Sequence, residues 1–168
     1  MAFQDTGGGV VMTNLTPAQK AEALIRRYFQ ACNDADHQGL VDCFTENGVH
    51  YFPPGLPGAP WRGARAIADG WVWCVKTLGS RWTIEKVLAR ADGREAVIEW
   101  THWKTAVGEV LRGDEWYVFN DDITRIVEIR AYYASPVNKS EPVNKLYEFD
   151  YEGRGYALQP PSPAPKIG

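Results

Sequence analysis

Residues 81–134 read RWTIEKVLARADGREAVIEWTHWKTAVGEVLRGDEWYVFNDDITRIVEIRAYYA, and apolar and polar side chains alternate through most of this stretch. Alternation with a period of two is typical of β-strands that bury one face. Turn signals at Asp92-Gly93, Gly108 and Asn120-Asp121-Asp122 divide the stretch into segments. The pattern predicts a four-strand antiparallel meander, with strands over about residues 81–91, 95–105, 109–119 and 125–134.

The residues before this meander repeat with a helical period instead. Thr16-Pro17-x-Gln19 is a capping box with proline at the first helical position, and it begins a helix whose apolar stripe runs from Ala21 to Cys32. We expect a shorter helix over about residues 36–44, a strand over 49–52 and a third helix over 63–77. Helices that are segregated from the strands of a sheet indicate an α+β domain.

Composition and charge limit the kinds of function. A chain of 168 residues fits one domain, and its net charge of -3 argues against binding to nucleic acid or to an anionic membrane. It has no run of 18 apolar residues and no secretory signal pattern, so no membrane span is expected. Three cysteines without disulfide or zinc spacing fit free thiols in a reducing, cytoplasmic environment: Cys32, Cys43 and Cys74.

The two ends of the chain differ in composition from its middle. Gly7-Gly8-Gly9 and few apolar anchors predict a flexible N-terminal tail over residues 1–14. A single domain is expected over residues 15–136. A C-terminal extension over residues 137–168 includes aromatic residues that could cover the pocket or a partner subunit, and it ends in a proline-rich tail.

One face of the predicted meander is almost entirely apolar and aromatic, and we take it as the inner face. In the last strand, alternation assigns Val127, Ile129 and Ala131 to this face. A carboxylate on such a face is costly unless it is paired or takes part in chemistry, so Glu115 is a candidate for function; alternatively it forms a buried ion pair with an arginine. The aromatic residues that we expect to line a pocket are Phe52, Trp71, Trp82, Trp100, Tyr117 and Tyr133.

Two of the three histidines, His50 and His102, also fall on inward positions. A histidine near its ordinary pKa of about 6.5 is a natural base at neutral pH. Alternatively, each is a core histidine whose ring nitrogens are satisfied by neighbours. Together with Glu115 they could form a metal triad, but their spacing matches no metal motif, and we expect no metal.

Several local motifs resemble the SnoaL-like, or nuclear transport factor 2-like, superfamily. They are Arg27-Tyr28-Phe29, Phe44-x-x-x-Gly48-Val49, Trp61-Arg62-Gly63-x-x-Ala66-Ile67 and Ile129-Arg130-Ala131-Tyr132-Tyr133. The resemblance implies a cone-shaped curved antiparallel sheet wrapped around three helices, with an internal pocket, as in a cystatin-like α+β barrel. It also implies a homodimer formed through the outer face of the sheet.

The ketosteroid isomerase branch of this superfamily gives a residue-level comparison. Tyr28 stands where that branch keeps its oxyanion-binding tyrosine, and Glu115 stands at the second acidic group of the same oxyanion hole. The catalytic aspartate would fall at Phe52, before Pro53. Phenylalanine cannot take a proton, so the resemblance implies a pocket that serves a different reaction.

These features together predict a cofactor-independent lyase, dehydratase or isomerase that acts on a small hydroxylated aromatic or polycyclic substrate. His102, or second His50, would abstract a proton, while Tyr28 and Glu115 would stabilise the developing charge or protonate the leaving group. No nucleotide, flavin, serine-hydrolase or zinc-protease motif is present. The alternatives are a non-catalytic binding or assembly module and, ranked lower, an epoxide hydrolase or polyketide cyclase.

Overall fold

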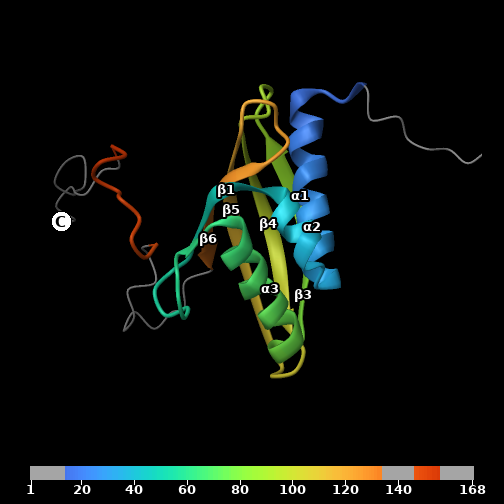
Figure 1. Cartoon of the computed structure of the whole chain (residues 1–168), viewed down its shortest axis with the longest axis vertical. Coiled ribbons are helices and arrows are strands. Elements are labelled where there is room, and N and C mark those ends of the chain that lie inside the picture. Colours follow the sequence, from blue (N-terminus) through green and yellow to red (C-terminus); the bar gives the residue numbers. More distant parts are fainter. Residues whose placement is uncertain (1–13, 134–145, 156–168) are drawn as a thin grey trace, which may run out of the picture.

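The computed structural model describes residues 14–133 and 146–155, and it contains three helices and one six-strand sheet (Figure 1). The predicted proline-rich tail and the predicted N-terminal tail up to residue 13 lie outside the described residues. The elements in chain order are α1 (Pro17–Asp34), α2 (His37–Cys43), β1 (Phe44–Tyr51), β2 (Trp61–Arg62), α3 (Ala64–Leu78), β3 (Ser80–Ala89), β4 (Glu95–Lys104), β5 (Glu109–Phe119) and β6 (Ile126–Tyr133).

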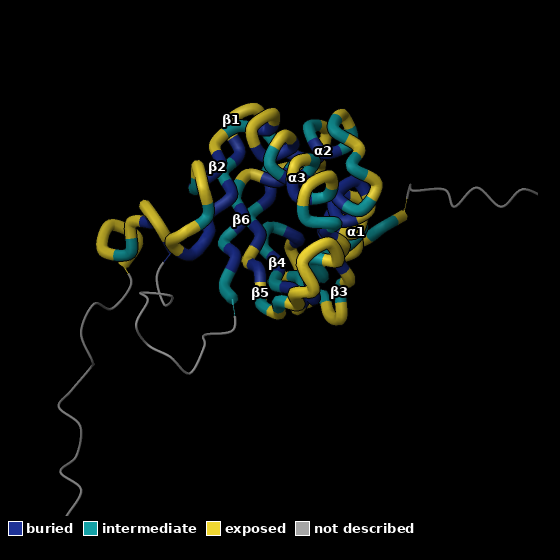
Figure 2. The backbone as a smooth tube through the Cα atoms, turned by 90° about the horizontal axis from the view of Figure 1, so that it is seen from below, coloured by how far each residue is buried: buried dark blue, intermediate teal, exposed yellow. Residues whose placement is uncertain are grey.

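The sheet is curved and unclosed, and all three helices pack against its concave side (Figure 2). Its strand order is β2-β1-β6-β5-β4-β3, so the predicted meander from β3 to β6 is confirmed. The remaining pairings add two features that the sequence did not predict: β1 lies parallel to β6, and the two-residue strand β2 pairs antiparallel with β1. The α+β class, with its curved sheet around helices, is confirmed.

The predicted capping box begins α1. The Thr16 hydroxyl accepts a hydrogen bond from the Gln19 backbone N–H, and the Gln19 side chain accepts one from the Thr16 N–H. The apolar stripe of this helix is buried against the sheet, while its other side carries exposed ion pairs such as Glu22–Arg26. This helix therefore closes one side of the cone.

Alternation assigned the inner face of the sheet correctly except at one position. Ile129 and Ala131 are buried, but Val127 is 36% exposed, so its predicted inward position is wrong. The cause is a shift in the pairing of β5 with β6: Val118 pairs with Glu128, whereas Phe119 pairs with Ile126. Such a β-bulge inserts one extra residue and reverses the alternation beyond it.

The C-terminal segment 146–155 packs on the outer side of β1 and β6 rather than over the concave side. Leu146 and Phe149 are buried there in a small cluster with Tyr51. The Arg154 guanidinium donates two hydrogen bonds to the carboxylate of Glu128 in β6. Within the described part of the chain, no helix is both long and apolar enough to cross a membrane.

Gly113 in β5 gives a test of how tightly the sheet is packed. A Cβ at this position would overlap the backbone carbonyl oxygen of Tyr132 and would lie 2.8 Å from the Trp100 ring. We expect Gly113→Ala to lower the free energy of unfolding by about 1–3 kcal/mol, because the backbone must shift to admit the methyl group. Urea titration measures this loss. The exposed neighbour Arg112→Ala should change stability by less than about 0.5 kcal/mol, and equal losses in the two variants would contradict the close packing.

Candidate functional site

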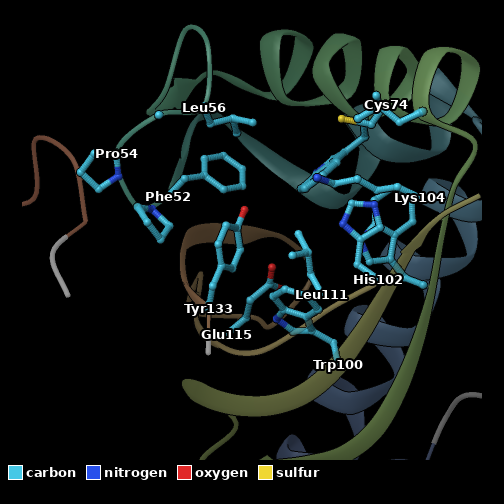
Figure 3. A pocket seen from close by; sticks show the side chains of 15 residues that line it. Phe52, Pro54, Leu56, Cys74, Trp100, His102, Lys104, Leu111, Glu115 and Tyr133 are labelled. Atoms are coloured by element: carbon cyan, nitrogen blue, oxygen red, sulfur yellow. The ribbon is translucent and has the colours of Figure 1, made fainter. Parts of the chain in front are cut away.

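A cavity of about 490 Å³ lies between the concave face of the sheet, helix α3 and the loop that follows β1 (Figure 3). Its walls are mostly apolar and aromatic. The residues that line it are Phe52, Pro53, Pro54, Gly55, Leu56, Trp71, Cys74, Leu78, Trp82, Trp100, His102, Lys104, Leu111, Glu115 and Tyr133.

Seven of the ten side chains that the sequence singled out line this cavity. They are His102, Glu115, Phe52, Trp71, Trp82, Trp100 and Tyr133. The three others, Tyr28, His50 and Tyr117, are not among the lining residues and are buried behind the wall. The inner face of the sheet thus brings most of the predicted site together, whereas the first helix does not contribute Tyr28 to the cavity surface.

Glu115 is the carboxylate of the cavity wall, and it is only 5% exposed. The Tyr117 hydroxyl donates a hydrogen bond of 2.5 Å to its Oε2 atom, and its Oε1 atom lies 3.7 Å from Nε2 of His50. Burial raises the pKa of Glu115 from 4.5 to about 7, although the Tyr117 hydrogen bond opposes this shift. The predicted alternative, a buried ion pair with an arginine, is not what the structure shows. The carboxyl group is therefore poised to give or take a proton near neutral pH.

His102 lines a different part of the cavity. Its Nε2 atom lies 2.8 Å from the Ser80 hydroxyl, and its ring stacks on Trp82 with 4.4 Å between centroids. Burial, with a smaller effect of the Lys104 charge, lowers the pKa of His102 to about 4. The imidazole is therefore neutral at physiological pH and able to accept a hydrogen bond, but it is a weaker base than an ordinary histidine.

Glu115 and His102 are well separated along the sheet. His102 in β4 pairs with Leu111 in β5, and Leu111 lies four residues from Glu115. At about 3.3 Å per residue, the two backbone positions are about 13 Å apart. Trp100 and Leu111 lie between them in the close-up (Figure 3). A single small functional group cannot touch both side chains, so a ligand that contacts both must be elongated.

His50 is fully buried behind Glu115, and aromatic rings surround it. It stacks on Phe52 with 4.0 Å between centroids and meets Trp61 and Trp71 at their edges. Burial lowers the pKa of His50 to about 3, so the imidazole is neutral in the folded protein. Its place behind the wall prevents direct contact with a ligand in the cavity.

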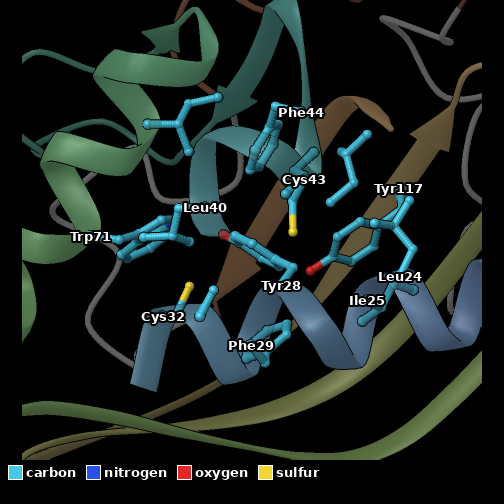
Figure 4. Close-up of a cluster of buried hydrophobic side chains, with 14 of the residues drawn as sticks. Leu24, Ile25, Tyr28, Phe29, Cys32, Leu40, Cys43, Phe44, Trp71 and Tyr117 are labelled. Atoms are coloured by element: carbon cyan, nitrogen blue, oxygen red, sulfur yellow. The ribbon is translucent and has the colours of Figure 1, made fainter. Parts of the chain in front are cut away.

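Tyr28 lies in the hydrophobic core between α1 and the sheet (Figure 4). Its ring contacts Phe29, Phe44 and Tyr117 edge-on. Burial raises its pKa well above the ordinary value, so it remains a neutral phenol. Tyr117 lies next to it and reaches the site only through its hydrogen bond to Glu115.

Other cavity residues were not singled out from the sequence. The loop Pro53–Leu56 has no periodicity, so only the structure places it at the cavity. Ser80 does not line the cavity but contacts His102; it shares the alternation of Trp82 and could have been found by extending that strand by one residue. Lys104, at the end of β4, pairs with Glu109 at 2.9 Å and marks the polar rim near His102.

In the described ranges, no group of three or more His, Cys, Asp and Glu side chains is arranged to hold a metal ion. All three cysteines are free and buried, and Cys74 lines the cavity. Burial raises the pKa of Cys74 to about 11, which keeps it as a thiol rather than a reactive thiolate.

Solved structures similar to this chain share its fold. A crystal structure of a protein of unknown function with a cystatin-like fold, from Methylobium petroleophilum PM1, is 45% identical, with a TM-score of 0.79 over 88% of this chain and 97% of that one. The epoxide hydrolase/cyclase-like enzyme SalBIII, described in pyran ring formation in the polyether salinomycin, is 17% identical, with a TM-score of 0.55 over 69% of this chain and 92% of that one.

A third similar structure is a Mycobacterium tuberculosis protein in complex with estradiol-17beta-hemisuccinate. It is 15% identical, with a TM-score of 0.59 over 71% of this chain and 95% of that one. No curated protein matches the chain. The model of the SnoaL-like domain matches residues 25–129, which is more than half of the sequence. The chain therefore belongs to the SnoaL-like family, within the nuclear transport factor 2-like superfamily.

Proposed function

We propose that the protein is an enzyme that catalyses elimination or proton relocation on a hydroxylated aromatic or polycyclic substrate by acid/base chemistry. One observation carries the proposal: the carboxyl group of Glu115 lies in the wall of an apolar cavity and has a pKa of about 7. A group with a pKa near the working pH is the most effective general acid or base. The proposal requires no cofactor.

Glu115 would act directly on the substrate. In its protonated form it gives a proton to a departing hydroxyl group, which leaves as water, and in its ionised form it takes a proton from carbon. The Tyr117 hydroxyl donates to the same carboxyl group and so stabilises the ionised form. Tyr28 would act from further behind, by packing against Tyr117 and holding its ring in place.

His102 would act at the other end of the substrate. Its neutral imidazole is a weak base with a pKa of about 4, but it can hydrogen-bond to a phenolic hydroxyl and take its proton in the same step in which the electron pair of the O–H bond moves through the conjugated ring. At the far end of the substrate a C–O bond breaks, and the departing oxygen takes the proton of Glu115. The separation of about 13 Å between the two backbone positions suits such an extended, conjugated substrate.

The aromatic walls favour a flat substrate. Trp71 meets Trp82 edge-on, and Trp100 meets Tyr133 in the same way. All four rings line the cavity and give it flat apolar surfaces. Pockets of this size and lining bind ligands mainly by burying their apolar surface. The complex of the Mycobacterium tuberculosis protein with estradiol-17beta-hemisuccinate and a computationally designed 17-OHP binder are compatible with a polycyclic ligand in this fold.

We also expect the protein to be a homodimer and to act in the cytoplasm. The outer face of the sheet carries Trp116, which is 44% exposed, and we expect a homodimer to cover it. The three free thiols fit a reducing, cytoplasmic environment.

A ligand screen tests whether the cavity binds such molecules. We expect hydroxylated aromatic, stilbene-like, steroid or polyketide-like compounds to raise the melting temperature, since a ligand at about 100 times its Kd adds about 2.7 kcal/mol to the stability of the folded state. That gain corresponds to a rise of roughly 5 °C or more for a domain of this size. Leu111→Trp is the matched control, because the larger side chain narrows the cavity. A shift of equal size in the wild type and in this variant would place binding elsewhere, and no shift across the panel would favour a binding or assembly role for a protein partner.

A further inference from the structure

The two ring nitrogens of His50 face two oxygen atoms of different chemistry. Its Nδ1 atom lies 3.4 Å from the backbone carbonyl oxygen of Tyr51, and its Nε2 atom lies 3.7 Å from Oε1 of Glu115. A carbonyl oxygen can only accept a hydrogen bond, so the contact with Tyr51 requires the hydrogen on Nδ1. In a neutral imidazole, Nε2 then carries a lone pair and no hydrogen.

The unprotonated Nε2 atom of His50 therefore faces Oε1 of Glu115 inside the protein. Among the described residues, Nε2 of His50 has no hydrogen-bond partner, and the atom is inaccessible to solvent. Two acceptors in this position repel each other if Glu115 is ionised. A proton on Oε1 turns the same contact into a hydrogen bond after a movement of less than about 1 Å.

Among the described residues, the surroundings of both groups contain no charge that would favour an ion pair. The titratable side chains whose protonation is coupled to Glu115 are Tyr28, Cys32, Tyr117 and Tyr133, and burial keeps each of them neutral. Around His50 the rings of Phe52, Trp61 and Trp71 are uncharged. A neutral pair that shares one proton is the arrangement that this apolar environment stabilises.

We propose that His50 is a positioning residue that forms a neutral, proton-sharing pair with Glu115. The carboxyl proton on Oε1 is donated to Nε2 of His50, while the Tyr117 hydroxyl donates to Oε2. His50 favours the protonated form of Glu115 and Tyr117 favours the ionised form. The two neighbours thus oppose each other, and together they hold the carboxyl group in one orientation at the cavity wall.

The role of this pair in catalysis rests on the proposed function, in which Glu115 acts as the acid. The pair is the resting state of the ligand-free protein, and the carboxyl hydrogen must turn from Nε2 of His50 to the departing oxygen in the cavity before it is transferred. The pair itself can be measured in the ligand-free protein without any turnover. If the pair is found and no substrate is turned over, the proposed function fails alone. If turnover depends on Glu115 and the pair is absent, only the role of His50 fails.

Nitrogen-15 NMR of the three histidine rings in the wild-type protein is the primary test. We expect His50 to remain in the neutral form with hydrogen on Nδ1 from about pH 5 to 9, and its Nε2 shift to change as Glu115 titrates. The signal is assigned through its loss in His50→Gln. Hydrogen on Nε2, or an imidazolium form near neutral pH, would overturn the proposal.

Two variants should shift the pH titration midpoint of Glu115 in opposite directions. The midpoint is measured by carbon-13 NMR of the glutamate carboxyl groups, and the Glu115 signal is assigned through its loss in Glu115→Gln. His50→Phe removes the acceptor and supplies no donor, so the protonated form of Glu115 loses a hydrogen bond and the titration midpoint of Glu115 should fall by about one pH unit. Tyr117→Phe removes the donor to the ionised form, so the midpoint should rise by a similar amount. A purely structural His50 predicts no downward shift. If His50→Phe does not fold, the wild-type nitrogen-15 spectrum decides alone.

Discussion

Replacing Glu115 by glutamine lowers the turnover number on a substrate found by the ligand screen by about 10²–10⁴-fold, the usual contribution of a general acid or base. Glutamine has nearly the same shape as a protonated glutamic acid and keeps an acceptor for the Tyr117 hydroxyl, but it cannot transfer a proton. Ligand affinity should therefore change little while turnover is lost. Steady-state kinetics with a parallel measurement of Kd separate the two effects.

The control for this variant is Glu99→Gln. Glu99 is an exposed carboxylate on the neighbouring strand β4, opposite Asp114 and away from the cavity. The Glu99→Gln substitution removes a carboxylate without changing the site, so the turnover number of this variant should equal that of the wild type. Turnover by Glu115→Gln within about threefold of the wild type would exclude Glu115 as the proton-transfer group.

The same Glu115→Gln substitution should make the folded protein more stable at about pH 8, by about 3 kcal/mol. Burial raises the pKa of Glu115 from 4.5 in the unfolded chain to about 7 in the folded protein. The group therefore contributes stability that is fully present below pH 4.5 and is lost as the pH rises through 7. Above that pH the folded wild type must hold a buried carboxylate, whereas glutamine stays neutral.

Urea unfolding of both proteins at two pH values tests this linkage. The advantage of the variant should be about 3 kcal/mol at about pH 8 and should shrink below about 1 kcal/mol at about pH 5. His50 and His102 have lowered pKa values, so their contributions fall as the pH drops below 6.5. Those losses occur in both proteins and largely cancel in the difference. An advantage that does not depend on pH would contradict the raised pKa of Glu115.

A stabilising substitution that removes activity has a simple physical reason here. Keeping a carboxyl group in an apolar wall costs stability whenever it ionises, and the same burial gives it a pKa useful for proton transfer. The wild-type protein thus exchanges stability for a group that titrates near neutrality.

The sequence predicted the inner face of the sheet well because alternation and burial have the same period. Glu115 and His102 were placed on that face from alternation alone, and both line the cavity. Alternation failed at Val127, where a bulge inserts one residue into β6. A bulge depends on the pairing of two strands, so no pattern within one strand reveals it.

Other parts of the site depend on contacts that local sequence patterns do not encode. The helical stripe of α1 predicts that Tyr28 is buried, but not whether it faces the cavity or the core, and the structure places it in the core. The parallel pairing of β1 with β6 puts His50 behind Glu115, although the two residues are far apart in the sequence. Sequence patterns therefore proposed the candidate groups, and the fold determined which of them meet.

The protonation state of Glu115 in the ligand-free protein tests the proposed chemistry most directly. Carbon-13 NMR of the glutamate carboxyl groups, recorded across the pH range for the wild type and for Glu115→Gln, isolates the titration of this one residue. A midpoint near pH 7, as burial in the cavity wall requires, is the expected result. A midpoint near the ordinary value of 4.5 would mean that the carboxyl group is solvated and not poised for proton transfer at neutral pH.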